Sequence, residues 1–212
     1  MPVVDRAPDR SIRPGGLVLW AETVMLTRVV VSSTNLQFLK DYATLYDQIG
    51  GVAFRVQFGP APVLIGIKLV ASLDEEAAKV KGSAYSTIVT GAVLGKSIRP
   101  QSIVGRVFWL KRRPGSRVST RITVGRFGDR DLMLPDHSIS RTHCVFDIKH
   151  GGAVTLEDLG SRNGTEIDDE KLEKGARHRL KGGELLTLGR IQLRYRTHAG
   201  FMETLKAMSK TL

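Results

Sequence analysis

Two short polar runs stand close together in the second half of the chain. The first, SISRTH, spans residues 138–143, and the second, GSRNGT, spans residues 160–165. A further arginine, Arg126, lies upstream in VGRFGD. The planar guanidinium group matches the oxygens of a phosphate, and each charge-assisted hydrogen bond contributes about 1.5–3 kcal/mol. If the fold brings the three segments together, they predict a site for a phosphate-sized dianion.

The segments between these runs indicate how they are positioned. After Gln101 the chain consists of short, often alternating apolar runs separated by turn formers such as RPGS, GDRD, HGG and KGG. This spacing is typical of an antiparallel β-sandwich or barrel. The loops of a sandwich gather at the ends of its sheets, so we expect the polar runs to meet at one end. The side chains expected there are Arg126, Ser140, Arg141, Arg162 and Asn163.

The first half of the chain has a different pattern. We expect strands within residues 17–31, a helix that begins near residues 33–35 and ends at Gly50, and a strand over residues 52–59. A short helix over residues 72–82 and a strand over residues 84–95 follow. The predicted fold class is mostly β, with a small mixed α/β segment (1–100), a β-sandwich (101–212) and a short terminal helix after residue 200. This division gives two domains, and the sequence indicates no function for the first.

The order and separation of the polar motifs carry a family resemblance. The string VGR…DLMLPDHSISRTHCVF…VTLEDLGSRNGT resembles the forkhead-associated (FHA) domain over about residues 102–197. The resemblance implies a non-catalytic β-sandwich that binds phosphothreonine peptides, with Arg126 and Ser140 on the phosphate and Arg141 as a second basic contact. It places Arg162 beside the phosphothreonine and Asn163 on the peptide backbone. Four further positions would organise the loops: Gly125, His143, Gly164 and Thr165.

The chain departs from the family pattern directly after NGT. It continues with Glu166 and then reads IDDE, which places Asp169 where many members have a turn glycine. We therefore expect a wider or bulged hairpin at this point. Simpler roles also remain open for the motif residues. A purely structural role is one alternative for His143, and a solvated position on the surface is the alternative for the arginines.

The charge of the chain favours an anionic partner. The net charge is +11, and residues 102–212 supply +8 of it. Such an excess suits a phosphorylated protein, a nucleic acid or a membrane surface. The expected partner is a phosphothreonine-containing protein in a Ser/Thr kinase pathway. Nucleic-acid binding is the alternative, although few aromatic residues accompany the basic runs. The oligomeric state stays open.

Other classes of function find little support in the sequence. Ser140 lacks a nucleophile elbow, the glycine-rich GSRNGT lacks the lysine of a phosphate-binding P-loop, and the five histidines and Cys144 show no metal spacing. We therefore expect no catalytic residue, metal or cofactor, and a buried, unreactive Cys144. The start of the chain has no signal-peptide pattern, and its apolar stretches are interrupted by charges. We expect a cytoplasmic protein without a membrane contact.

Overall fold

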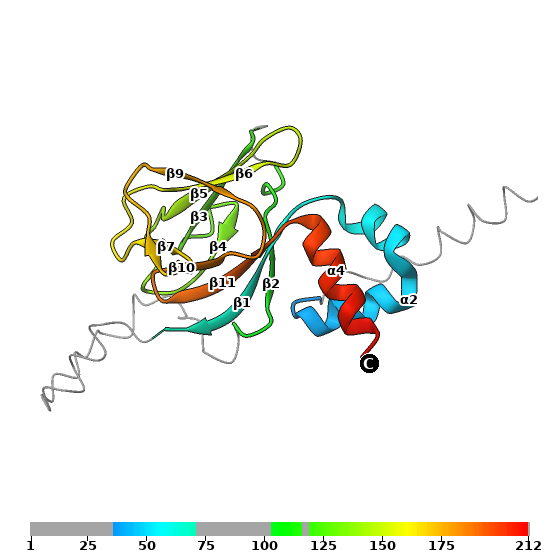
Figure 1. The fold of residues 1–212 in the computed structure, drawn as a ribbon. Coiled ribbons are helices and arrows are strands. Elements are labelled where there is room, and N and C mark those ends of the chain that lie inside the picture. The colour runs from blue at the N-terminus through cyan, green and yellow to red at the C-terminus, as the bar shows by residue number, and fades with distance from the viewer. Residues whose placement is uncertain (1–35, 71–102, 116–118, 212) are drawn as a thin grey trace, which may run out of the picture. The chain divides into compact units, whose positions relative to one another are not determined.

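The fold was taken from a computed structural model, which describes residues 36–70, 103–115 and 119–211 (Figure 1). The described residues belong to one compact unit. Its elements are α2 (Leu39–Phe58), β1 (Val63–Leu69), β2 (Val107–Trp109), β3 (Arg121–Gly125), β4 (Leu132–Met133), β5 (Cys144–Ile148), β6 (Val154–Asp158), β7 (Thr165–Ile167), β8 (Glu170–Lys171), β9 (Arg177–Leu180), β10 (Leu185–Leu188), β11 (Ile191–Arg196) and α4 (His198–Ser209).

The strands form two sheets. The six-stranded sheet has the order β2-β1-β11-β10-β7-β8, and the five-stranded sheet has the order β4-β3-β5-β6-β9. Only the short β3–β4 pair is parallel among the strand pairs of the described residues. The predicted fold class, a mostly antiparallel β-sandwich with a terminal helix, is confirmed.

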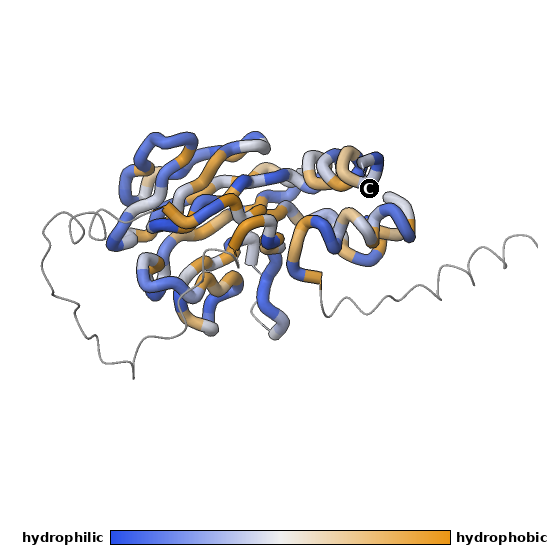
Figure 2. Tube along the Cα trace, turned by 90° about the horizontal axis from the view of Figure 1, so that it is seen from below, coloured by the Kyte–Doolittle hydropathy of each residue, from blue (hydrophilic) through white to orange (hydrophobic). Residues whose placement is uncertain are grey.

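The core between the sheets follows from the alternation along each strand. On β6, Val154, Leu156 and Asp158 are buried, whereas Thr155 and Glu157 between them are partly exposed. Neighbouring strands place Phe146 opposite Leu156, so that both enter the same apolar cluster. Full burial of one such side chain stabilises the fold by about 1.5–3 kcal/mol. In Figure 2 the apolar colouring is accordingly concentrated along the strands, and the loops are largely hydrophilic.

Strand β1 comes from the part of the chain that was expected to form a separate segment. It pairs with β11 on one side and with β2 on the other. Leu64 faces the core between the sheets, while Val63 and Ile65 belong to a second apolar cluster. Burial on both faces explains why the run VLIGI is continuously apolar instead of alternating. The sandwich thus takes a strand from residues 1–100, which the expected division at residue 101 would leave outside it.

Helix α2 includes residues for which the sequence predicted a strand. The helix begins at Leu39, where the Asp41 carboxylate accepts the Phe38 N–H at 3.1 Å, and continues through a kink at Gly50 to Phe58. The predicted strand over residues 52–59 is therefore wrong. The apolar residues that alternate along this run also recur at every fourth position, which is a helical spacing. Phe54 and Phe58 are buried together, while Val52 and Val56 on another side of the helix are exposed.

Helices α2 and α4 pack on each other and on the outer side of β1 and β2. Five aromatic rings form the centre of this second cluster, in edge-to-face, tilted and stacked pairs. The members are Tyr42, Phe54, Phe58, Trp109 and Phe201. The Trp109 indole N–H donates to the Tyr42 hydroxyl at 3.0 Å, so the polar atoms of both rings are satisfied. The terminal helix is thus docked mainly against another helix, with Leu205 also buried.

The hairpin after the second polar run is tighter than expected. Ile167 pairs with Glu170, so only Asp168 and Asp169 form the turn. Their φ angles are +50° and +68°, which is the left-handed region. The prediction of a wider or bulged hairpin is wrong, because aspartate tolerates this conformation better than most residues. The Leu185 N–H donates to the Asp168 carboxylate at 2.8 Å and helps to hold the turn.

The remaining expectations for the first half cannot be compared with the fold. The strands within 17–31, the helix over 72–82 and the strand over 84–95 lie outside the described residues. In the part of the chain that is described, neither helix combines the length and the apolar character required to span a bilayer.

Candidate functional site

Ser140 joins the three loops that carry the predicted site residues. These loops cover residues 126–131 between β3 and β4, 134–143 between β4 and β5, and 159–164 between β6 and β7. The Arg126 N–H donates to the Ser140 carbonyl at 3.0 Å, and the Arg162 N–H donates to the Ser140 hydroxyl at 2.9 Å. Because the hydroxyl oxygen accepts this bond, its own hydrogen is the group available to a bound anion.

Two of the arginines are gathered around one aromatic ring. The guanidinium carbon of Arg126 lies 5.4 Å from the centre of the Phe127 ring, and that of Arg141 lies 6.0 Å from it. Phe127 is 48% exposed, so this ring contact occurs at the surface. Cation–π attraction at exposed sites is worth about 0.5–1 kcal/mol, which offsets part of the repulsion between two like charges. The ring therefore keeps both guanidinium groups in one area.

The third loop presents one more cation and an amide. Arg162 and Asn163 are both exposed, and the Arg162 main chain is fixed through Ser140. The Asn163 side chain donates from Nδ2 to the Ser138 carbonyl at 2.8 Å. Part of this amide is thus engaged by the protein, in addition to the peptide main-chain contact that the family resemblance implies.

His143 connects two of the loops from below the surface. It is fully buried, its Nδ1 accepts the Ser140 N–H at 3.2 Å, and its Nε2 lies 3.1 Å from the Gly164 carbonyl. This pattern requires a neutral ring with hydrogen on Nε2, which donates to Gly164. Burial lowers the pKa of His143, although the Gly164 bond and the Asp158 carboxylate act in the opposite direction. The ring bonds the main chain of Ser140 and not its hydroxyl, so it is not placed as a base for that serine.

Asp158 organises the loop that contains Asn163. Its carboxylate accepts hydrogen bonds from the Gly160 N–H at 2.7 Å, from the Ser161 N–H at 2.8 Å, and from the hydroxyls of Ser161 at 2.6 Å and Thr165 at 2.7 Å. Burial would raise the pKa of Asp158, but these four bonds outweigh it and hold the pKa below the usual range. Thr165 is fully buried beneath the loop, so it cannot contact a ligand at the surface.

Two glycines allow close approaches between the loops. A Cβ atom on Gly125 would lie 2.1 Å from the Arg141 carbonyl oxygen, so any side chain at this position would separate the first two loops. Gly164 has a φ of +83°, and its carbonyl accepts bonds from His143 and from the Gly189 N–H at 3.1 Å. These contacts place both glycines, His143 and Thr165 in the framework of the loops.

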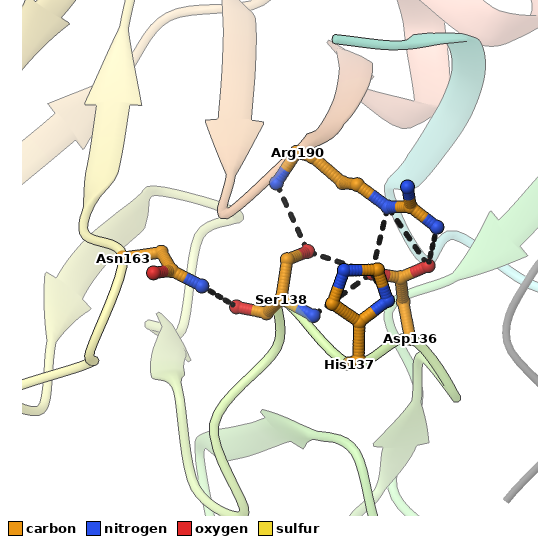
Figure 3. A network of polar contacts seen from close by, with 5 residues as sticks. All are labelled: Asp136, His137, Ser138, Asn163 and Arg190. Atoms are coloured by element: carbon orange, nitrogen blue, oxygen red, sulfur yellow. Dashed lines mark hydrogen bonds and ion pairs between the residues drawn. The ribbon is translucent and has the colours of Figure 1, made fainter. Parts of the chain in front are cut away.

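Several residues near the site were not found from the sequence. Beneath Ser138, Asp136 forms an ion pair with Arg190, whose distance from it along the chain hides the contact (Figure 3). Phe127 was also missed, and Asp158 was given no role although it belongs to the quoted motif. Asp158 is the last residue of β6 and lies two positions before the Gly160-Ser161 pair, which is a typical signal of a carboxylate that caps a turn. Nothing in the sequence distinguishes Arg190 from the other basic residues near the end of the chain.

The arrangement can bind an anion but offers little for other chemistry. Across the described residues, no three histidine, cysteine or acidic side chains are grouped to hold a metal ion. Cys144 is fully buried, and burial raises the pKa of its thiol far above the usual range, so it is unreactive. The groups of the site that reach solvent fully or in part are guanidiniums, one hydroxyl and one amide, all of which donate hydrogen bonds.

Comparisons with known proteins agree on one family. The FHA domain model matches residues 122–189. Protein FraH of Nostoc sp. (strain PCC 7120) is 35% identical over 81 residues, which cover 38% of this chain and 26% of FraH. Glycogen accumulation regulator GarA of Mycolicibacterium smegmatis is 31% identical over 112 residues, which cover 50% of this chain and 67% of GarA.

A solved FHA domain, described for its phosphothreonine-dependent interactions, is 28% identical with a TM-score of 0.37. That match covers 44% of this chain and 86% of the solved domain. The chain thus spans about a quarter of the length of FraH but two thirds of GarA. With the motifs, the sandwich and the relatives in agreement, the chain belongs to the FHA domain family.

Proposed function

We propose that the FHA domain of this chain binds a phosphothreonine-containing segment of a partner protein. The observation that carries this proposal is the double attachment of Ser140 to the main chains of Arg126 and Arg162. These bonds attach the main chains of arginines from two other loops to the residue that supplies the hydroxyl donor. FHA domains recognise phosphorylated motifs through such basic clusters. A phosphate monoester carries a charge of about −1.5 to −2 at neutral pH, which is suited to more than one guanidinium.

Each residue of the site then has a role. Arg126 and the Ser140 hydroxyl bind the phosphate, and Arg141 adds a second cation beside Phe127. Arg162 lies next to the phosphothreonine, and Asn163 bonds the peptide main chain. Selectivity for phosphothreonine over phosphoserine is expected from the family. In this role the protein is a non-catalytic adaptor in Ser/Thr kinase signalling.

The first test measures binding of the full chain to a phosphothreonine peptide selected from a library, by calorimetry. Arg126→Ala and Ser140→Ala should each weaken binding roughly 10- to 150-fold, because each removes about 1.5–3 kcal/mol of charge-assisted hydrogen bonding. The unphosphorylated peptide should not bind. Arg177→Ala is the matched control, since Arg177 is an exposed arginine on β9 that pairs with Glu157. Unchanged affinity in both site variants would contradict the proposal.

A single-stranded oligonucleotide tests the alternative of nucleic-acid binding on the same samples. A nucleic-acid interaction should weaken steeply as salt rises and should not depend on Ser140. If the oligonucleotide binds more tightly than the phosphopeptide, and Arg126→Ala leaves that binding unchanged, the basic surface has a different partner and the proposed function is wrong.

A further inference from the structure

The three loops at residues 126–131, 134–143 and 159–164 are called the recognition loops below. The turn between β10 and β11 lies beneath two of them, those at residues 134–143 and 159–164. Only Gly189 and Arg190 form it, because Leu188 pairs directly with Ile191. The Gly189 N–H donates to the Gly164 carbonyl at 3.1 Å, and the Arg190 N–H donates to the Ser138 hydroxyl at 3.0 Å. Two successive main-chain N–H groups of this turn therefore hold one loop each.

The Arg190 side chain reaches a buried carboxylate in the same place. Asp136 is fully buried, and Arg190 binds it with Nε at 3.0 Å from Oδ1 and Nη2 at 2.9 Å from Oδ2 (Figure 3). Ser138 also donates to Asp136 Oδ1, from its N–H at 2.9 Å and from its hydroxyl at 2.8 Å. The exposed ring of His137 is 3.7 Å from the same oxygen. Loss of the guanidinium would leave a buried charge without its main counterion.

These contacts hold Ser138 through its N–H and its hydroxyl, and the carbonyl of the same residue determines how the Asn163 amide is oriented. A carbonyl oxygen only accepts hydrogen bonds, so the NH₂ group of Asn163 must face it. The Oδ1 atom of the same amide therefore faces away from the Ser138 carbonyl. Gly189 allows this carbonyl to lie close to the turn. A Cβ atom there would lie 2.6 Å from the Ser138 oxygen, and the φ of +56° also disfavours a side chain.

We propose that Arg190, acting through Asp136 and Ser138, is a positioning residue that sets the orientation of the Asn163 amide and thereby the main-chain direction of a bound phosphopeptide. This inference rests on the proposed function. An amide with fixed oxygen and nitrogen sides pairs with a peptide main-chain amide in one sense only. One peptide residue must therefore supply an N–H to Asn163 Oδ1, and a peptide that lacks this N–H should bind more weakly.

The experiment uses the full chain and a phosphothreonine peptide scanned with single main-chain N-methyl groups. In the wild-type protein one N-methyl position should weaken binding about 2- to 12-fold beyond its neighbours, the range for one neutral hydrogen bond. Asn163→Ala should abolish this position-specific loss. Arg190→Gln should also abolish it, and the double variant should bind no more weakly than Asn163→Ala alone. Arg194→Gln is the control, because Arg194, on the strand that follows Arg190, bonds the Gly183 carbonyl instead.

Arg190→Lys covers the case in which Arg190→Gln fails to fold. It keeps a positive charge beside Asp136 but loses the planar fork. A second readout needs no ligand. In nuclear magnetic resonance spectra, the Asn163 side-chain NH₂ signals should be dispersed in the wild-type protein and in Arg194→Gln, and should move toward free-amide positions in Arg190→Lys.

The outcomes separate this inference from the proposed function. An unchanged N-methyl profile and unchanged NH₂ signals in the Arg190 variants would overturn the inference while phosphopeptide binding stands. Losses that multiply in the double variant would also overturn it, because they would show that Arg190 acts independently of Asn163. Failure of the wild-type protein to bind any phosphopeptide would overturn the proposed function, and the NH₂ signals would then decide whether Arg190 orients the amide.

Discussion

The recognition loops and the α2–α4 helix pair are held by opposite kinds of interaction. In the loops, the contacts are hydrogen bonds made by the Ser140 main chain, the His143 ring and the Asp158 carboxylate. In the helix pair, aromatic rings such as Phe54 and Phe201 pack with almost no polar contacts among them. The apolar packing needs burial of every ring, whereas the hydrogen-bonded loops leave their guanidinium groups in solvent.

This difference suggests a division of tasks. Directional hydrogen bonds fix atoms of the loops to within a narrow range, as a binding site requires. Apolar burial has no preferred direction and supplies most of the folding free energy. We therefore expect changes in the helix pair to alter stability with little effect on binding, and changes in the loops to do the reverse.

The largest expected effect comes from Phe201→Ala in α4. Phe201 is fully buried against the rings of Tyr42, Phe54 and Trp109, and its truncation should lower the free energy of unfolding by about 3–5 kcal/mol. Urea denaturation measures this loss. The phosphopeptide affinity of the protein that remains folded should stay unchanged. Val56→Ala is the control, since Val56 is 82% exposed on α2 and should change stability by less than about 0.5 kcal/mol. A parallel loss of affinity in Phe201→Ala would break the proposed division.

Lowering the pH should have an intermediate effect on the free energy of unfolding, and both regions should contribute to it. Burial lowers the pKa of His143 in the loops below its ordinary 6.5. Burial, together with the charges of Arg55 and Lys111, does the same for His198 at the start of α4. Below about pH 6.5 the unfolded chain binds protons that the folded chain does not, so the free energy of unfolding should fall as the pH decreases. Urea denaturation between about pH 7.5 and pH 5 measures the slope.

Single variants assign this slope to the two regions. His143→Gln and His198→Gln should each flatten it, whatever their effect on stability at neutral pH. The carboxylate of Asp158 does not contribute in this range, since hydrogen bonds hold its pKa below the usual range and it stays ionised there. A slope that is the same in the wild type and both variants would show that neither ring is held neutral by the fold.

The smallest effect is expected at the β7–β8 turn, where two aspartates differ in their contacts. Asp169→Gly should stabilise the protein by about 0.5–1 kcal/mol, because glycine adopts a φ of +68° without strain. A calorimetric scan should show a rise in Tm of about 1–4 °C. Asp168→Gly relieves similar strain but loses the bond from the Leu185 N–H, so it should not stabilise. Equal shifts in both variants would show that this bond contributes nothing.

The sequence predicted the regions whose signals are local. Short alternating runs identified the strands of the second half, and the polar motifs located the three loops that Ser140 joins. The second half of α2 was missed because of its repeat pattern. Apolar residues at every second position predict a strand, but such a pattern also places apolar residues four positions apart, as on one side of a helix. The Asp168–Asp169 turn was missed because two residues with positive φ are uncommon without glycine or asparagine.

Contacts between distant parts of the chain carried no such signal. Arg190 and Asp136 are separated by 54 positions, and neither residue type identifies the other as its partner in the sequence. The same holds for β1, whose neighbours in the sheet are β2 and β11. A continuously apolar run predicts burial on two sides but does not say which strands provide it.

The position of β1 inside the larger sheet has a practical consequence. A truncated protein that starts at residue 101 would keep every recognition loop but lose the strand that fills the space between β2 and β11. The N–H and C=O groups of β11 would then form an open edge, which is a template for association with other molecules. Fragments made for binding studies should therefore begin before Leu39, so that weak or irregular binding is not caused by aggregation.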